Sequence, residues 1–275
     1  MGGLARLVRR RLIADRRRDD GFGGDKKGMS MNLPAGATTI LAKMGEDEFS
    51  IRCFDTRASK SILAQILKGK TYPIIDFIGE VGTVLDVGAN IGAFAIFSSL
   101  MYPGAKVHAL EPAAEPFWLL EENARQFANI DVYNTGLFSK DCTMPLYKGD
   151  IDSVTASVGH SRHNSTLSEV VALRAADRWM RENGLDTPDI LKVDTEGCEI
   201  GILESLREWL PEIKVLYLEY HSENDRRAID GLLRDSHVLL AGTVHAPHRG
   251  EFTYVARNAF PTDDARDELE IIVDF

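Results

Sequence analysis

The chain has 275 residues, 44% of them hydrophobic, and a formal net charge of −10 at pH 7. This length allows a substantial buried core, and the negative charge argues against a general nucleic-acid-binding protein, because the phosphate backbone is repelled by an acidic surface. No apolar run approaches the roughly 18 residues of a membrane-spanning helix, so we expect no stable membrane insertion.

The three cysteines, Cys53, Cys142 and Cys198, are an odd number and lack the spacing of metal ligands. This pattern favours reduced thiols, which are typical of cytosolic proteins. The amino-terminal segment also lacks the sustained apolar core of a signal peptide. We therefore expect a cytoplasmic protein, and the sequence leaves its oligomeric state open.

Residues 1–28 hold nine Lys or Arg and four Asp, so the charge along the chain is uneven. Leu4, Leu7 and Val8 recur at helical spacing, and one interpretation is a short basic helix in weak contact with an anionic membrane surface. Acidic residues dilute the positive charge, however. The favoured interpretation is a flexible basic tail over residues 1–30.

Residues 31–80 predict a cap that precedes the main domain. Two strand-like runs, Ala37 to Met44 and Glu48 to Phe54, flank a turn and predict a β-hairpin. Ser59 to Leu67 and Tyr72 to Ile78 predict helices. This cap would cover one edge of a sheet and supply a lid or part of a substrate wall.

The most informative stretch runs from Thr83 to Pro112 and is typical of a strand, a glycine turn, a helix and a second strand. Thr83 to Val87 is a short apolar run of the kind buried on both faces of a sheet, and small residues follow it. Lys106 to Leu110 predicts the next strand, which ends at Glu111. This spacing places a carboxylate at the strand end, where a βαβ nucleotide site binds ribose.

The glycine turn indicates what kind of ligand the site would bind. Gly88 and Gly92 let the backbone approach a ligand, and Glu111 can accept hydrogen bonds from two ribose hydroxyls. A dinucleotide fingerprint would also require glycines where this chain has Asn90 and Ala93. An acid at the strand end, Asp86, would repel phosphates and suits a cationic ligand.

Strand and helix patterns alternate through the rest of residues 83–236, which predicts a doubly wound parallel α/β sheet. Two polar loops interrupt them, at 151–166 and 243–251, and they contain His160, His163, His245 and His248. The predicted elements after the central motif are a helix over Glu115–Ala128, a strand over Ile130–Leu137, strands over Cys142–Tyr147 and Ser168–Leu173, a helix over Arg174–Asn183, strands over Asp189–Asp194 and Ile213–Glu219, a helix over Asp225–Asp235, and an antiparallel pair at His237–Ala241 and Phe252–Ala256.

Three separated patterns, VLDVGANIG with ALEP, NTGLFS, and ILKVDTEGCEIGILESL, resemble the FkbM-type family of class I S-adenosylmethionine-dependent methyltransferases. The resemblance covers roughly residues 75–240, and its most specific part is K-V-D-x-E-G-x-E. It implies a Rossmann-like, mostly parallel seven-stranded sheet whose last strand is antiparallel. It also implies S-adenosylmethionine as cofactor and methylation of an oxygen in a sugar, glycan or natural product. The cofactor-binding residues would be Asp86, Gly88, Asn90, Gly92, Glu111 and Asn134, the last beside the adenine.

Methyl transfer to an alcohol needs a group that removes the hydroxyl proton. Asp194, Glu196, Glu219 and His221 follow adjacent predicted strands, and we expect His221 to be the base, with Asp194 and Glu196 as the other catalytic residues. The acids would also suit a divalent metal, which we consider without favouring it.

Two other functions fit parts of the pattern. An NAD-dependent oxidoreductase would use the same βαβ unit, and a non-catalytic module would use the fold for protein contacts. The preferred organisation is a basic tail at 1–30, the cap at 31–80, a methyltransferase domain at 81–260 and an acidic segment at 261–275. Its partner would be a small-molecule or glycan acceptor, and no nucleic acid.

Overall fold

The computed structural model describes residues 34, 36–148, 156–158, 166–246 and 248–261. The basic tail predicted over residues 1–30 lies outside these ranges, and the description below concerns the chain from Gly36 onward. Within the described ranges, every helix is too short or too polar to cross a membrane.

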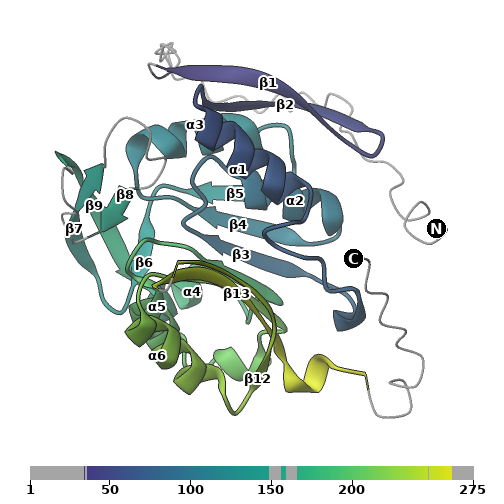
Figure 1. The fold of residues 1–275 in the computed structure, drawn as a ribbon, viewed down its shortest axis with the longest axis vertical. Coiled ribbons are helices and arrows are strands. Elements are labelled where there is room, and N and C mark those ends of the chain that lie inside the picture. The colour runs from purple at the N-terminus through teal and green to yellow at the C-terminus, as the bar shows by residue number, and fades with distance from the viewer. Residues whose placement is uncertain (1–33, 35, 149–155, 159–165, 247, 262–275) are drawn as a thin grey trace, which may run out of the picture. The chain divides into compact units, whose positions relative to one another are not determined.

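A seven-stranded sheet forms the centre of this unit (Figure 1). Five consecutive strands, which extend to one edge of the sheet, are parallel to one another, and β13 (Arg249–Ala256) is antiparallel to both of its neighbours. This confirms the predicted doubly wound, mostly parallel sheet. In spatial order the strands are β12 (His237–Ala246), β13 (Arg249–Ala256), β11 (Val215–Tyr220), β10 (Ile190–Val193), β3 (Thr83–Val87), β4 (Lys106–Leu110) and β5 (Ile130–Tyr133).

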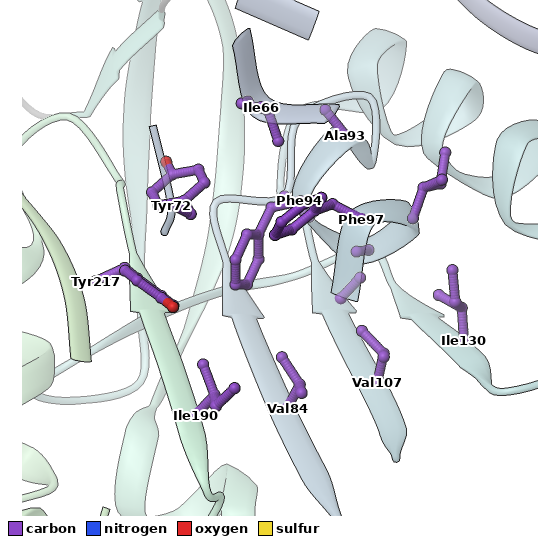
Figure 2. Close-up of a cluster of buried hydrophobic side chains, with 14 of the residues drawn as sticks. Ile66, Tyr72, Val84, Ala93, Phe94, Phe97, Val107, Ile130, Ile190 and Tyr217 are labelled. Atoms are coloured by element: carbon purple, nitrogen blue, oxygen red, sulfur yellow. The ribbon is translucent and has the colours of Figure 1, made fainter. Parts of the chain in front are cut away.

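Helices cover both faces of the sheet. Successive side chains of a strand point to opposite faces, and in these strands both sets are mostly apolar and need to be buried. Val84 of β3 is buried in the cluster that contains α2 and α3, whereas Leu85 is buried in the cluster that contains α4, α5 and α6. Figure 2 shows the first cluster, with Phe94 and Phe97 of α2 above the strands. The helices are α2 (Ala93–Met101), α3 (Ala114–Ala124), α4 (Ala176–Glu182), α5 (Glu199–Ser205) and α6 (Glu223–Leu233).

The cap begins with the predicted hairpin, β1 (Ala37–Met44) and β2 (Asp47–Phe54), which forms its own two-stranded sheet. It continues with α1 (Arg57–Leu67), where the Thr56 hydroxyl caps the first turn by accepting the Ser59 amide at 3.1 Å. The hairpin and the helix are therefore confirmed.

The prediction of a second helix in the cap, from Tyr72 to Ile78, is wrong. Within this range only Asp76–Ile78 is helical, as a single 3-10 turn. Tertiary contacts hold this segment extended. The Tyr72 ring packs edge-on against Phe94 and Tyr217, and the Tyr217 hydroxyl donates to the Pro73 carbonyl at 2.5 Å.

A second, four-stranded sheet contains β6 (Gly136–Phe138), β9 (Thr166–Ala175), β7 (Cys142–Lys148) and β8 (Ala156–Val158), in that spatial order. The single strand predicted over 130–137 is therefore two strands in different sheets. β5 ends at Tyr133, where the Thr135 amide turns back to the Tyr133 carbonyl at 3.0 Å, and β6 then pairs with β9. Most of the predicted 151–166 loop, with His160 and His163, lies outside the described residues.

The closing strands are longer than predicted. β12 and β13 pair from His237 opposite Ala256 to Ala246 opposite Arg249, so most of the predicted 243–251 loop belongs to an antiparallel hairpin. Figure 1 shows this pair at one edge of the main sheet. The consequence for the site is that Arg249 begins a strand beside β11.

Candidate active site

A cavity opens at the carboxyl ends of β3, β4 and β10, where open α/β sheets bind ligands. Its empty volume of about 1100 Å³ includes the solvent at its open mouth. The glycine turn, Glu111 and residues of α1 line it.

The glycine turn after β3 forms one wall of this cavity. Its residues 88, 90 and 92 all have positive φ, at 78°, 51° and 89°. Glycine adopts such angles freely, and asparagine does so more readily than most residues, which explains Asn90 where the turn would otherwise need a third glycine. A Cβ on Gly88 would lie 1.9 Å from the Asp194 carbonyl oxygen, so only glycine lets the turn cross the chain that follows β10.

Glu111 lines the cavity at the end of β4 and is 8% exposed. Its two carboxylate oxygens accept hydrogen bonds from the Asn90 and Ala113 amides, both at 2.9 Å. Burial raises the pKa of Glu111 to about 7, although these hydrogen bonds oppose the shift. The carboxylate is thus held rigidly beside the glycine turn, as a bidentate acceptor for two hydroxyls requires.

Asp86 lies beneath the turn. It is fully buried, does not line the cavity, and pairs with the Lys192 ammonium at 3.1 Å. Burial raises the pKa of Asp86 even though Lys192 opposes the shift. The same ammonium donates to the Gly88 carbonyl at 2.6 Å. Asp86 therefore supports the turn through Lys192 and has no direct access to a ligand.

Sequence reasoning missed Lys192, although one signal could have found it. A lysine within a central parallel strand, Ile190–Val193, is rare because both faces of such a strand are buried. Its presence there indicates a buried acidic partner, which is Asp86.

Asn134 takes a position different from the predicted adenine contact. Its side chain is exposed and does not line the cavity. The amide donates to the carbonyls of Glu111 and Pro112, at 3.0 and 3.1 Å. Asn134 therefore braces the turn that carries Glu111.

Asp194 is at the cavity surface with 34% of its side chain exposed. The Tyr72 hydroxyl donates to Asp194 Oδ2 at 3.4 Å, and the Lys192 ammonium is 3.9 Å from the same oxygen. Burial favours a higher pKa for Asp194, but Lys192 and a hydrogen bond from Glu219 outweigh it and hold the pKa below its usual range. Tyr72, which sequence reasoning also missed, is the link between the cap and this carboxylate.

His221 is enclosed by carboxylates at the end of β11. Its Nε2 lies 3.0 Å from Glu196 Oε2 and 3.3 Å from Glu219 Oε2, and its Nδ1 lies 3.6 Å from Glu199 Oε1. Burial would lower the pKa of His221, but the three carboxylates raise it to about 12. Both ring nitrogens are buried, and His221 does not line the cavity. The structure therefore does not place His221 where it could take a proton from an acceptor hydroxyl.

Arg249 completes this cluster. It donates to Glu219 Oε1 at 2.6 Å and to Glu196 Oε1 at 3.1 Å. Burial and the neighbouring Asp194 carboxylate raise the pKa of Glu219 to about 8. Glu199 is 2% exposed and accepts the Thr195 amide at 2.9 Å, which fixes the chain between β10 and α5. Arg249 is a further residue that the sequence did not identify.

The sequence matches known methyltransferases. The family described as the methyltransferase FkbM domain matches residues 86–249. The 31-O-demethyl-FK506 methyltransferase FkbM of Streptomyces tacrolimicus is 28% identical over 254 residues, which cover 78% of this chain and 87% of that protein. The hexuronic acid methyltransferase AglP of Haloferax volcanii is 28% identical over 155 residues, 55% of this chain and 61% of that protein.

Among solved structures, the methyltransferase FkbM from Methylobacillus flagellatus is similar with a TM-score of 0.46 and 18% identity, over 64% of this chain and 43% of that chain. The family match covers more than half of this chain and includes the glycine turn, Glu111 and the cluster around His221. The protein is a methyltransferase, and it belongs to the FkbM methyltransferase family.

Proposed function

We propose that the protein transfers a methyl group from S-adenosylmethionine to a hydroxyl of a sugar, glycan or natural product. The observation that carries this proposal is the position of Glu111, whose rigid carboxylate lies beside the glycine turn in an open cavity at the carboxyl ends of the strands. Bound S-adenosylmethionine supplies a methyl group already activated by a sulfonium. The protein's main task is then to position the two reactants.

The charges around the cavity support a cationic cofactor. Glu111, Asp194 and Glu196 line it, and Lys192 is already paired with buried Asp86. A pyrophosphate would meet these carboxylates at close range, whereas an ammonium or a sulfonium would be attracted. The same charges argue against the alternative of an NAD-dependent oxidoreductase.

Asp194 is the residue that we propose to act on the acceptor hydroxyl. It is at the cavity surface, and Tyr72 and Lys192 hold its Oδ2 in place. A carboxylate within hydrogen-bond reach of the hydroxyl can orient it and accept its proton as the methyl group transfers. His221 would then be a positioning residue for Glu196 and Glu219, and the sequence-based proposal of a histidine base moves to Asp194.

The activities named for the relatives support an oxygen acceptor. One relative acts on 31-O-demethyl-FK506, another on a hexuronic acid, and NoeI of Sinorhizobium fredii is a 2-O-methyltransferase with 23% identity over 166 residues. In this chain, α1 contributes Ile62, Leu63 and Ile66 to the cavity wall. This wall would contact the carbon body of an acceptor whose hydroxyl reaches Asp194.

The cofactor is tested by isothermal titration calorimetry of the full chain with S-adenosylmethionine and with NAD. We expect binding of the first alone, and a loss of about 1.5 to 3 kcal/mol in Glu111→Ala through the missing charge-assisted contacts. Glu121→Gln is the matched control and should bind normally, because Glu121 is a half-exposed acid of α3 that does not line the cavity. Binding of NAD in place of S-adenosylmethionine would contradict the proposal.

The acceptor is tested by mass spectrometry of glycans and hydroxylated metabolites after incubation with isotopically labelled S-adenosylmethionine. We expect a labelled methyl group on oxygen in at least one acceptor class. Cofactor binding without transfer to any acceptor would instead support a non-catalytic module.

We also propose that the protein acts in the cytoplasm on a small molecule or glycan and binds no nucleic acid. The free thiols of Cys53, Cys142 and Cys198 and the acidic body of the chain support this. Fractionation of cells would test the first part, and a salt-dependent gel shift with RNA would test the second. We propose residues 81–260 as the catalytic domain, with 31–80 as its cap.

A further inference from the structure

We propose that Glu196, Glu219 and His221 form a binding site for a divalent metal cation beside the methyl-transfer cavity. One ligand atom from each of the three residues lies within 4.8 Å of the others. The side chains are 8%, 5% and 12% exposed, so the site is inside the protein. Glu196 follows β10, and the other two residues are at the end of β11, so two neighbouring strands hold the site.

The distances between the ligand atoms fit a bound cation. His221 Nε2 is 3.0 Å from Glu196 Oε2 and 3.3 Å from Glu219 Oε2. A cation with bonds of about 2.0 to 2.2 Å to nitrogen and oxygen keeps neighbouring ligands about 3.0 to 3.5 Å apart in octahedral or tetrahedral geometry. The two separations that involve His221 are therefore those expected around a metal, and the two glutamate oxygens lie within 4.8 Å of each other.

The surroundings of the imidazole suit a positive charge at its ring nitrogens. Both ring nitrogens of His221 are buried, and carboxylate oxygens lie 3.0 to 3.6 Å from them. The carboxylates that stabilise a proton on Nε2 would equally stabilise a metal cation bound there in its place.

Neighbouring residues orient the ligands as they do around known metal sites. Arg249 donates to Oε1 of both Glu196 and Glu219, which turns their Oε2 atoms toward His221. Glu199 Oε1 lies 3.6 Å from the other ring nitrogen of His221, Nδ1. A carboxylate behind a histidine and hydrogen bonds to ligating carboxylates are the usual outer contacts of a metal centre.

The charge of the surroundings also suits a divalent cation. Asp194 and Glu199 add two carboxylates to those of Glu196 and Glu219. The nearby cations are the Arg249 guanidinium and the Lys192 ammonium, which is 3.9 Å from Asp194 and already paired with Asp86. One nitrogen and two oxygen ligands favour a first-row transition ion such as Mn²⁺ or Zn²⁺, because Mg²⁺ and Ca²⁺ prefer oxygen alone.

A cation at this site would lie close to the acceptor, since Glu196 also lines the cavity. It would lower the pKa of a coordinated hydroxyl and assist its deprotonation. This catalytic role rests on the proposed function, whereas the metal site itself does not.

The site is tested with Mn²⁺ on full-length protein that has been stripped with chelator and carries no histidine tag. Electron paramagnetic resonance and calorimetry should show one Mn²⁺ per chain, competed by Zn²⁺ and more weakly by Mg²⁺. Glu196→Gln, Glu219→Gln and His221→Ala should each weaken Mn²⁺ at least tenfold. Glu208→Gln, which removes an exposed acid elsewhere, should leave the affinity unchanged.

Binding of S-adenosylmethionine in the same samples serves as the readout for folding and for the proposed cofactor. Glu219→Gln keeps the shape of a side chain that does not line the cavity, so we expect this variant to bind the cofactor with wild-type affinity while losing Mn²⁺. Wild-type protein that binds no stoichiometric Mn²⁺ or Zn²⁺, or a set of variants that all bind Mn²⁺ like wild type, would overturn the metal site. Failure to bind S-adenosylmethionine would instead contradict the proposed function and leave the metal result standing.

Discussion

Replacing Gly88 by alanine should damage the fold and the cofactor site together. The added Cβ would lie 1.9 Å from the Asp194 carbonyl oxygen and 2.9 Å from its carbonyl carbon. An ordinary contact needs about 3.4 Å or more, so either the glycine turn or the segment at Asp194 must move by about 1.5 Å. Both segments carry site residues, because the turn contains Asn90 and the other segment contains Asp194.

Two terms contribute to the cost of Gly88→Ala. The φ angle of 78° costs about 1 to 2 kcal/mol for a residue with a Cβ. Displacing the backbone in a packed region adds about 1 to 3 kcal/mol. The free energy of unfolding should therefore fall by about 2 to 5 kcal/mol, a large part of the 5 to 15 kcal/mol typical of a domain.

Gly184→Ala separates the two terms. Gly184 has a φ of 61°, but a Cβ there would have no heavy atom within 4 Å, so this variant should show the backbone cost alone. Urea unfolding followed by circular dichroism measures both variants, and calorimetry measures S-adenosylmethionine. Gly88→Ala should be less stable than Gly184→Ala by at least 1 kcal/mol and should bind cofactor at least tenfold more weakly. Equal stability of the two variants would refute the close crossing at Asp194.

Further predictions follow from the buried charges and from the tail. Lys192→Met should lower the free energy of unfolding by about 3 to 5 kcal/mol, because it leaves Asp86 buried without a partner, and Asp86→Leu in the same chain should restore much of the loss in urea unfolding. Glu111 holds its proton up to about pH 7 when folded but loses it near pH 4.5 when unfolded, so its contribution makes stability fall as the pH rises through this window. Glu111→Gln should flatten that part of the pH profile, and an unchanged slope would contradict the raised pKa. Asp194→Asn should reduce turnover about 10²- to 10⁴-fold, by a larger factor than it weakens cofactor binding, which steady-state kinetics and calorimetry together would check. Deletion of residues 1–28 should leave cofactor affinity and turnover within a few-fold of wild type in the same assays, because their composition is typical of a tail.

Local patterns in the sequence predicted the central strands of the main sheet and the part of the site formed by the glycine turn and Glu111. Thr83–Val87 and Lys106–Leu110 are strands with the predicted bounds, because a short apolar run between turn residues has few other ways to be buried. Gly88 and Glu111 occur at opposite ends of one βαβ unit, and the parallel pairing of its strands brings them together. Motifs confined to one such unit can be recognised without knowledge of the rest of the chain.

Tertiary packing determined the rest of the site, around Asp194 and His221. The sequence showed acids and a histidine after two strands, but it did not show that His221 is enclosed by three carboxylates, with Arg249 behind two of them. Likewise, Tyr72 reaches Asp194 across 122 positions of the chain. The protonation and exposure of such groups depend on neighbours that are far apart in sequence and meet only when the sheet, the cap and the closing hairpin pack together. The glycine turn and the acids at the strand ends were therefore readable from the sequence, whereas the contributions of Tyr72, Lys192 and Arg249 and the chemical roles of the site residues were set by the fold.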